Sequence, residues 1–256
     1  MGKQEEVEFH DRFVTTTDLR SFEGKFYSVT AQEKEESLAF EYLGDLSNRR
    51  LLFYGAGGHF SMIRKFVQRG ALVTAIDISP ETIESLKRAV ASEGMDAKCT
   101  LLVMDCESLQ IADSSMDIVF ARSIIHHLDT ELSLKEIKRV LAPNGKLVAL
   151  EPLGTNPVIN VYRYFTPQSR TRGEHPFVPR DLKLFFRYFG KVHVHYLYFL
   201  SIFSYVYRML DPNDARFVKV FRFLDGIDNA LVRGVPLYRY LCWEAILCCQ
   251  KTEESR

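Results

Sequence analysis

The sequence predicts an α/β fold in which a doubly wound, mostly parallel sheet carries helices on both faces. Short apolar runs alternate with segments of helical periodicity from about residue 50 to about residue 150, which is the pattern of repeated strand and helix units. The first run breaks into Gly55-Ala56-Gly57, and later runs end in acidic residues. Because the carboxyl ends of parallel strands meet at one edge of a sheet, we expect these residues to surround one ligand site.

Length, charge and cysteine content restrict the class of protein. The 256 residues suit one α/β domain, which we place at residues 49–256, preceded by a helical cover at residues 1–48. Lys and Arg number 33 and Asp and Glu number 33, so no net charge attracts nucleic acid, and we expect no nucleic-acid partner. The five cysteines lack metal-ligand spacing, which favours reduced thiols, a cytoplasmic location and no bound metal. We find no export signal in the sequence.

The N-terminal part is charged and aromatic, and it leads into a helical stretch around residues 33–46. Ala39, Phe40, Leu43 and Leu46 fall on one face of that stretch at three- and four-residue steps. We therefore expect a helix that leans on the domain and covers its site.

The first unit of the domain is a strand, a glycine turn and a helix. Leu51–Tyr54 is apolar, Gly55-Ala56-Gly57-Gly58 forms the turn, and apolar residues then recur at helical spacing from Phe60. Free N–H groups and the dipole of a helix that starts at such a turn favour an anionic ligand group. A plain turn between packed elements is the alternative that the motif alone leaves open.

The second strand, Leu72–Ile76, ends in Asp77. An acidic side chain at this place lies beside the first turn, where it can accept hydrogen bonds from both hydroxyls of a ribose. The alternative is that Asp77 caps the next helix. Ser79 and Pro80 already supply an N-cap and a first helical residue, so the ribose interpretation is preferred.

Three further strands complete the pattern of this half of the chain. Residues 100–104 lead into Asp105-Cys106, residues 116–121 lead into Arg122 and then His126-His127, and residues 146–150 end in Glu151. A helix at residues 134–141 stops at Ala142-Pro143-Asn144-Gly145.

Together these residues resemble the class I S-adenosylmethionine-dependent methyltransferases. The resemblance covers roughly residues 50–152 and is carried by the glycine turn, by the acid in Ala75-Ile76-Asp77-Ile78-Ser79, by Asp105-Cys106, and by Leu141–Gly145. The stretch Ile124–Leu128 is similar to the subgroup that includes the ubiquinone and menaquinone C-methyltransferases.

The resemblance implies a Rossmann-like sheet of seven strands with the last one antiparallel, and S-adenosyl-L-methionine as cofactor. The glycine turn would let the backbone approach the methionine part, Asp77 would hold the ribose, and Asp105 with Cys106 would meet the adenine. The residues implied to bind the cofactor are Tyr54, Gly55, Ala56, Gly57, Asp77, Ile78, Asp105, Cys106, Ala121 and Arg122.

The chain departs from the family pattern at two positions. Phe53 stands where the family usually has an acid two residues before the first glycine, and His59 stands where it has a third glycine. The missing acid removes a polar anchor for the methionine end of the cofactor. A non-catalytic or weakly active protein that binds S-adenosylmethionine or S-adenosylhomocysteine is therefore the alternative function.

Histidines follow the fourth strand, where the transferred methyl group must lie. His127 is the first candidate base, because imidazole removes protons near neutral pH, and because a histidine at the matching place belongs to the catalytic pair of the related phosphoethanolamine methyltransferases. A packing role for the His-His-Leu turn is the alternative. Glu151, Glu174 and His175 are further candidates for contact with the acceptor, with surface polarity as their alternative.

The C-terminal half suggests a cover over an apolar acceptor. Residues 153–177 show no clear periodicity, which is typical of a functional loop. Strands are expected at about 191–196 and 240–250, and the apolar and aromatic residues 197–238 between them are predicted to form a helical insertion over the site. The acceptor would be a small isoprenoid-, lipid- or natural product-like molecule. Dimer contact and peripheral membrane contact are the competing interpretations, and the state would be a monomer or a homodimer.

A nicotinamide dehydrogenase also uses a glycine turn and an acid after the second strand. Its third glycine position is occupied here by Phe60, whose bulk would prevent close approach of helix and strand. The sequence therefore predicts transfer of a methyl group to a small molecule, and it leaves open whether an O, N or C atom accepts it.

Overall fold

The computed structural model describes residues 29–166, 173–211 and 213–252. Strands and helices alternate from β1 to β5 as the sequence predicts, except that β4 follows β3 with no helix between them. The strands are β1 (Arg50–Tyr54), β2 (Leu72–Asp77), β3 (Cys99–Val103), β4 (Met116–Arg122), β5 (Leu141–Pro152), β6 (Lys191–Leu197) and β7 (Glu244–Gln250). The α-helices are α3 (Val29–Leu43), α4 (Phe60–Gln68), α5 (Pro80–Ser92), α6 (Thr130–Val140), α7 (Pro157–Phe165), α8 (Pro179–Tyr188), α9 (Phe203–Leu210) and α10 (Asp214–Gly234).

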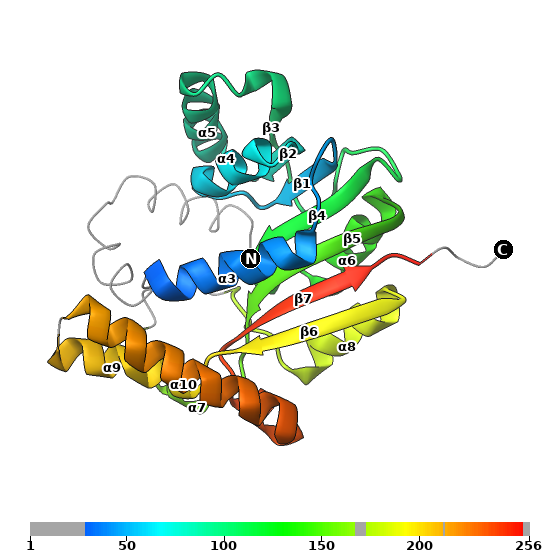
Figure 1. The fold of residues 1–256 in the computed structure, drawn as a ribbon. Coiled ribbons are helices and arrows are strands. Elements are labelled where there is room, and N and C mark those ends of the chain that lie inside the picture. Colours follow the sequence, from blue (N-terminus) through cyan, green and yellow to red (C-terminus); the bar gives the residue numbers. More distant parts are fainter. Residues whose placement is uncertain (1–28, 167–172, 212, 253–256) are drawn as a thin grey trace.

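One seven-stranded sheet runs through the molecule in the order β3-β2-β1-β4-β5-β7-β6 (Figure 1). The pairs among β1 to β5 are parallel, whereas β7 is antiparallel to β5 and to β6. The order reverses between β1 and β4, which is the switch point where ligands bind in open α/β sheets. The predicted doubly wound, Rossmann-like sheet with an antiparallel last strand is confirmed.

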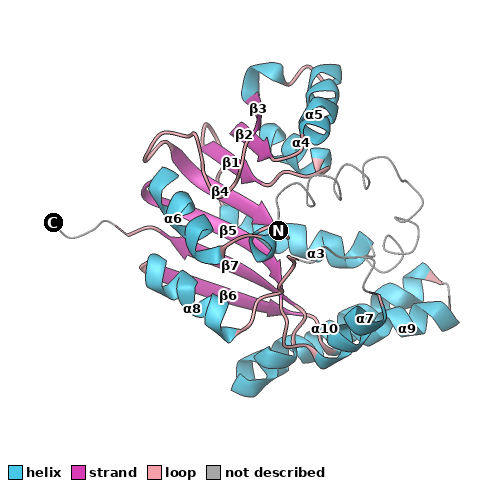
Figure 2. Ribbon diagram, turned by 180° about the vertical axis from the view of Figure 1, so that it is seen from behind, coloured by secondary structure: helices cyan, strands magenta, loops and turns pink. Residues whose placement is uncertain are grey.

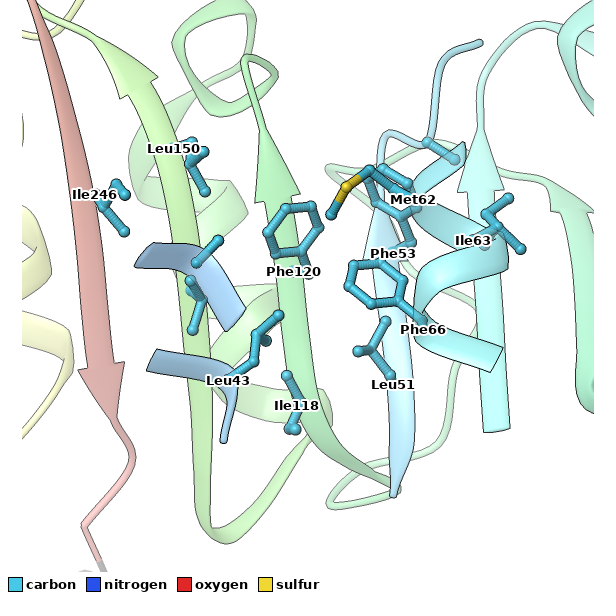
Figure 3. Close-up of a cluster of buried hydrophobic side chains, with 14 of the residues drawn as sticks. Leu43, Leu51, Phe53, Met62, Ile63, Phe66, Ile118, Phe120, Leu150 and Ile246 are labelled. Carbon is cyan, nitrogen blue, oxygen red and sulfur yellow. The ribbon is translucent and has the colours of Figure 1, made fainter. Parts of the chain in front are cut away.

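Apolar side chains pack on both faces of the sheet. On one face α3 packs on β5 and β7, α4 packs on β2, and α5 packs on β2 and β3. Phe53, Phe66 and Phe120 lie within that layer (Figure 3). Helices α6 and α8 cover the other face (Figure 2). Their side chains Leu134, Ile137 and Phe185 are buried there. Because both faces are covered, the parallel strands are apolar along their length, as such sheets require.

Several boundaries differ from the expectation. Helix α7 lies within the stretch 153–177 that was expected to be irregular; Asn156 is its N-cap, accepting a hydrogen bond from Ile159 N at 2.9 Å, and Pro157 is its first residue. Strand β5 starts at Leu141 instead of residue 146, with a shift of register opposite residues 116–118 and Asn144 at φ +61°. Strand β7 starts at Glu244, because a 3₁₀ helix occupies Pro236–Leu241.

Between β6 and β7 the chain forms a 3₁₀ turn at Leu200–Ile202 and the helices α9 and α10, so the region is helical as expected. In Figures 1 and 2 these helices lie with α7 beyond the carboxyl ends of the parallel strands. The division into a cover at 1–48 and a domain at 49–256 stays a prediction, and residues 1–28 lie outside the described part. Among the described residues, no helix combines the length and the apolar character needed to cross a bilayer.

Candidate functional site

The glycine turn after β1 has a backbone that only glycine adopts without strain. Gly55 and Gly57 have φ values of +66° and +50°. A Cβ atom on Gly55 would overlap the side chain of Ile124, and Ala56 N donates to Ile76 O at 2.8 Å. The turn is therefore packed against β2 and against the segment that follows β4, and it holds the start of α4 in a fixed place.

Asp77 lies at the end of β2 beside this turn. Its Oδ2 accepts a hydrogen bond from Gly57 N at 2.8 Å, and its Oδ1 accepts one from Ser79 N at 2.9 Å. The Ser79 hydroxyl, in turn, accepts from Thr82 N at 3.1 Å and is the N-cap of α5. Ser79 is therefore the N-cap of α5, and the Asp77 carboxylate is fixed beside the glycine turn.

The residues after β3 and β4 flank Asp77 and the turn. Asp105 accepts a hydrogen bond from Glu107 N at 2.9 Å, and the carbonyl oxygen of Cys106 accepts one from the Tyr54 hydroxyl at 2.6 Å. Cys106 is buried, and burial raises the pKa of its thiol well above the ordinary value. Its side chain thus stays protonated and packs as an apolar group. Ile78 is half-buried, Ala121 is buried, and Arg122 ends β4.

Glu151, at the end of β5, is 1% exposed. Its Oε1 accepts hydrogen bonds from the backbone N–H groups of Ile124 and Ile125 at 3.3 and 3.0 Å. Its Oε2 accepts from His126 N at 3.4 Å and lies 2.7 Å from His126 Nδ1. The carboxylate therefore fixes the 3₁₀ turn Ile125–His127, which carries both histidines.

The other candidate catalytic residues border the same turn. The rings of His126 and His127 have centroids 4.1 Å apart. His175 N donates to His126 O at 3.0 Å, so the segment before Phe177 runs along the turn, although the His175 side chain is exposed. Ligand atoms of His126, His127 and Glu174 all lie within 4.8 Å of one another. Folding thus brings His127, Glu151, Glu174 and His175 to one place.

A buried charged cluster lies at the same edge, and the sequence analysis missed two of its members. Arg122 Nη2 donates to Glu35 Oε2 of α3 at 2.8 Å, with only 10% and 3% of these side chains exposed. Glu244, at the start of β7, is buried beside Glu35 and forms a hydrogen bond with it. These residues come from α3, β4 and β7, which are distant in the sequence, so no local motif links them.

Burial and the neighbouring Glu35 raise the pKa of Glu244 well above its ordinary value. Arg122 acts in the opposite direction, while Glu151 raises the pKa further. In the window from the unfolded value of about 4.3 up to the raised folded value, the folded chain binds more protons than the unfolded one, so stability falls as pH rises. Glu244 is thus a neutral donor to Glu35 at the lower end of this window.

We expect Glu244→Gln to change the free energy of unfolding, relative to the wild type, more favourably at pH 8 than at pH 5. The reason is that the amide mimics the protonated acid at every pH, whereas the wild-type acid loses its proton as pH rises. Each unit by which folding raises the pKa corresponds to about 1.4 kcal/mol in the free energy of unfolding. Urea unfolding at both pH values measures the difference, with the exposed Glu41→Gln on α3 as control. An equal effect of Glu244→Gln at pH 5 and pH 8 would contradict the assignment.

Comparison with known proteins supports the resemblance. Residues 54–149 match a methyltransferase domain family. The chain is 30% identical over 103 residues to a sterol 4-C-methyltransferase of Caenorhabditis elegans, covering 40% of this chain and 30% of the relative. It is 39% identical over 80 residues to the ubiquinone/menaquinone biosynthesis C-methyltransferase UbiE of Geotalea daltonii, covering 31% of this chain and 34% of the relative. The matches thus span about a third of these curated relatives.

Among solved structures, phosphoethanolamine N-methyltransferase 2 of Haemonchus contortus in complex with S-adenosyl-L-methionine has the same fold. The TM-score is 0.63 at 18% identity, covering 86% of this chain and 53% of that one. The sheet order, the glycine turn and the matched family together define a class I methyltransferase fold. Within this fold, residues 54–149 are similar to the methyltransferase domain family.

The residues at the carboxyl edge fit this cofactor. The space beside Gly55 is filled by Ile124, whereas a Cβ atom on Gly57 would meet only the His59 ring, at 3.6 Å. The backbone at Gly57 is therefore open to a ligand, and the Asp77 carboxylate lies beside it. Phe53, in contrast, is fully buried in the apolar layer below the turn and supplies no polar contact.

Proposed function

We propose that this protein transfers a methyl group from S-adenosylmethionine to a small apolar or aromatic acceptor. The observation that carries the proposal is the glycine turn with Asp77 hydrogen-bonded to Gly57 N at 2.8 Å, within a domain that matches the methyltransferase family. In this proposal the cofactor is bound by the residues that the resemblance implies, from Tyr54 to Arg122.

The bound cofactor supplies an electrophilic methyl group on a positively charged sulfur. Transfer is an in-line displacement in which the bond from carbon to sulfur breaks as the bond to the acceptor forms, and the positive charge is lost. The protein must therefore align the acceptor and exclude water, and alignment alone can supply about 7–11 kcal/mol of the barrier. The rigid turn and Asp77 fix one partner, and the helices beyond the sheet edge enclose the other.

The acceptor class is proposed from the apolar surface of those helices and from the relatives. Tyr164, Phe165 and Leu210, on α7 and α9, are 80%, 73% and 82% exposed. Side chains of this kind at the edge that carries the site suit an isoprenoid- or lipid-like molecule. The names of the two curated relatives refer to a sterol and to quinones, which supports the same class.

Within this proposal His127 accepts a proton from the acceptor and Glu151 is a positioning residue. Glu151 is buried and holds the backbone of the turn Ile125–His127, so it sets where His127 stands without facing the acceptor itself. His175, whose backbone is bonded to His126, is proposed to contact the acceptor from the segment 173–177.

Transfer of radioactive methyl from labelled S-adenosylmethionine to a lipid extract tests the proposal. We expect label in a product that partitions into organic solvent, and we expect His127→Ala to lower its rate by about 10²–10⁴-fold if His127 is the base. Unchanged turnover in His127→Ala removes it from the mechanism. Binding of the cofactor without transfer to any acceptor favours the alternative, a non-catalytic cofactor-binding protein, which the burial of Phe53 in place of the family's acid supports.

A further inference from the structure

We propose that His126, His127 and Glu174 form a binding site for one divalent metal ion of the Zn²⁺ type. The two imidazoles and the carboxylate offer ligand atoms that lie within 4.8 Å of one another. Two histidines and one glutamate are a ligand set that zinc enzymes use, with a further position open to water or substrate. The sequence analysis expects no metal, because the cysteines lack metal-ligand spacing. The ligands proposed here are brought together only by folding, since Glu174 is distant from the histidines in the chain.

The first argument for this site is the fixed tautomer of His126. Its Nδ1 lies 2.7 Å from Glu151 Oε2, so with an ionised carboxylate, which can only accept, Nδ1 is the donor. In that tautomer Nε2 is the ring atom available to a metal ion. His126 is 3% exposed and Glu151 is 1% exposed, so the pair is shielded from water. A carboxylate that orients a histidine in this way is the usual support of a metal-bound imidazole.

The second argument is that the backbone holds the ligands together. Glu151 accepts hydrogen bonds from the N–H groups of the turn that carries both histidines, and His175 N donates to His126 O at 3.0 Å. The latter bond ties the segment of Glu174 to the same turn. Zinc bonds of about 2.1 Å in a tetrahedral site place ligand atoms roughly 3.4 Å apart. His126 is held by Glu151, so closing the site requires the half-buried side chains of His127 and Glu174 to move toward it.

The inference goes beyond the proposed function and does not depend on it, because binding is measured without cofactor or acceptor. With an ion bound, His127 is a ligand and cannot also accept a proton. The ion would then lower the pKa of an acceptor group bound at its open position, and solvent water would take the released proton in place of His127.

Titration of chelator-treated protein with Zn²⁺, in competition with a chromophoric chelator, tests the site. We expect one ion per chain and at least about a tenfold higher Kd for His127→Ala and for Glu174→Gln. Glu151→Gln, which leaves the three ligands in place but alters the support of His126, should raise Kd by about 10–100-fold. Circular dichroism shows whether each variant is folded, and Glu174→Gln changes a loop residue, so at least one variant reports on a native fold.

Two controls make the result specific to these residues. His193→Ala and Glu41→Gln, both at exposed positions outside the cluster, should leave Kd unchanged. Titration with Co²⁺ should give visible bands without the thiolate charge-transfer band that a cysteine ligand produces. Three results would each overturn the proposal. They are absence of Zn²⁺ binding by the wild type, wild-type affinity in both His127→Ala and Glu174→Gln, and a thiolate band in the Co²⁺ spectrum.

Discussion

Replacing Phe53 by alanine is expected to lower the free energy of unfolding by about 3–5 kcal/mol, the range for deletion of a buried aromatic ring. Phe53 is fully buried, and its ring packs edge-on against those of Phe120 and Phe66 (Figure 3). The ring centroids are 5.3 Å apart for Phe120 and 5.8 Å apart for Phe66. Phe53 and Phe120 are also register partners on β1 and β4, so the residual cavity would lie on the helix-covered face of two paired strands, which cannot readily move to fill it. Urea denaturation followed by circular dichroism measures the loss.

The matched control is Phe223→Ala, because that phenylalanine is 69% exposed on α10 and should change stability by no more than about 0.5 kcal/mol. A loss below about 1 kcal/mol for Phe53→Ala would contradict the packing described here. Phe53→Asp separates packing from the polar role that an acid has in the family. We expect that variant to be destabilised and not to gain cofactor affinity, because the site of the side chain is apolar.

Replacing Asp77 by alanine is expected to weaken binding of S-adenosylmethionine by about 100-fold. Hydrogen bonds to a charged group are worth about 1.5–3 kcal/mol each, and loss of about 3 kcal/mol corresponds to that change in Kd. Asp77 also accepts hydrogen bonds from Gly57 N and Ser79 N, so its removal loosens the turn as well. Isothermal titration calorimetry with S-adenosylmethionine and S-adenosylhomocysteine measures both affinities.

A second ligand distinguishes contact with the ribose from support of the turn. We expect the wild type to bind a 2′-deoxy analogue of S-adenosylhomocysteine more weakly than the parent compound, and Asp77→Ala to bind the two alike. The exposed Asp96→Ala is the control and should bind as the wild type does. If Asp77→Ala keeps the full preference for the ribose hydroxyl, Asp77 does not hold the ribose.

Much of the fold could be predicted because its signals are local. Ser79 and Pro80 mark the start of α5, and the Ser79 hydroxyl caps that helix as expected. Asn156 and Pro157 carry the same kind of signal for α7, which the sequence analysis left within an irregular stretch. The shift of register at the start of β5 has no comparable signal, since it depends on pairing with β4.

The candidate site could be predicted only in part. The turn, Asp77 and Asp105 lie at strand ends, and the topology of the sheet alone brings strand ends together. The contact of Glu35 with Arg122 and Glu244 depends instead on where α3 and β7 pack, which periodicity does not specify. His126 could have been recognised as a partner of Glu151 only through the three-dimensional arrangement that buries both residues.

The most direct test of the central claim is a calorimetric titration of the wild-type protein with S-adenosylmethionine and S-adenosylhomocysteine, with NADH in parallel. We predict that both sulfur compounds bind with one molecule per chain and that NADH gives no heat of binding. The absence of binding by either sulfur compound to the folded protein would contradict the assignment of the glycine turn and Asp77 to this cofactor.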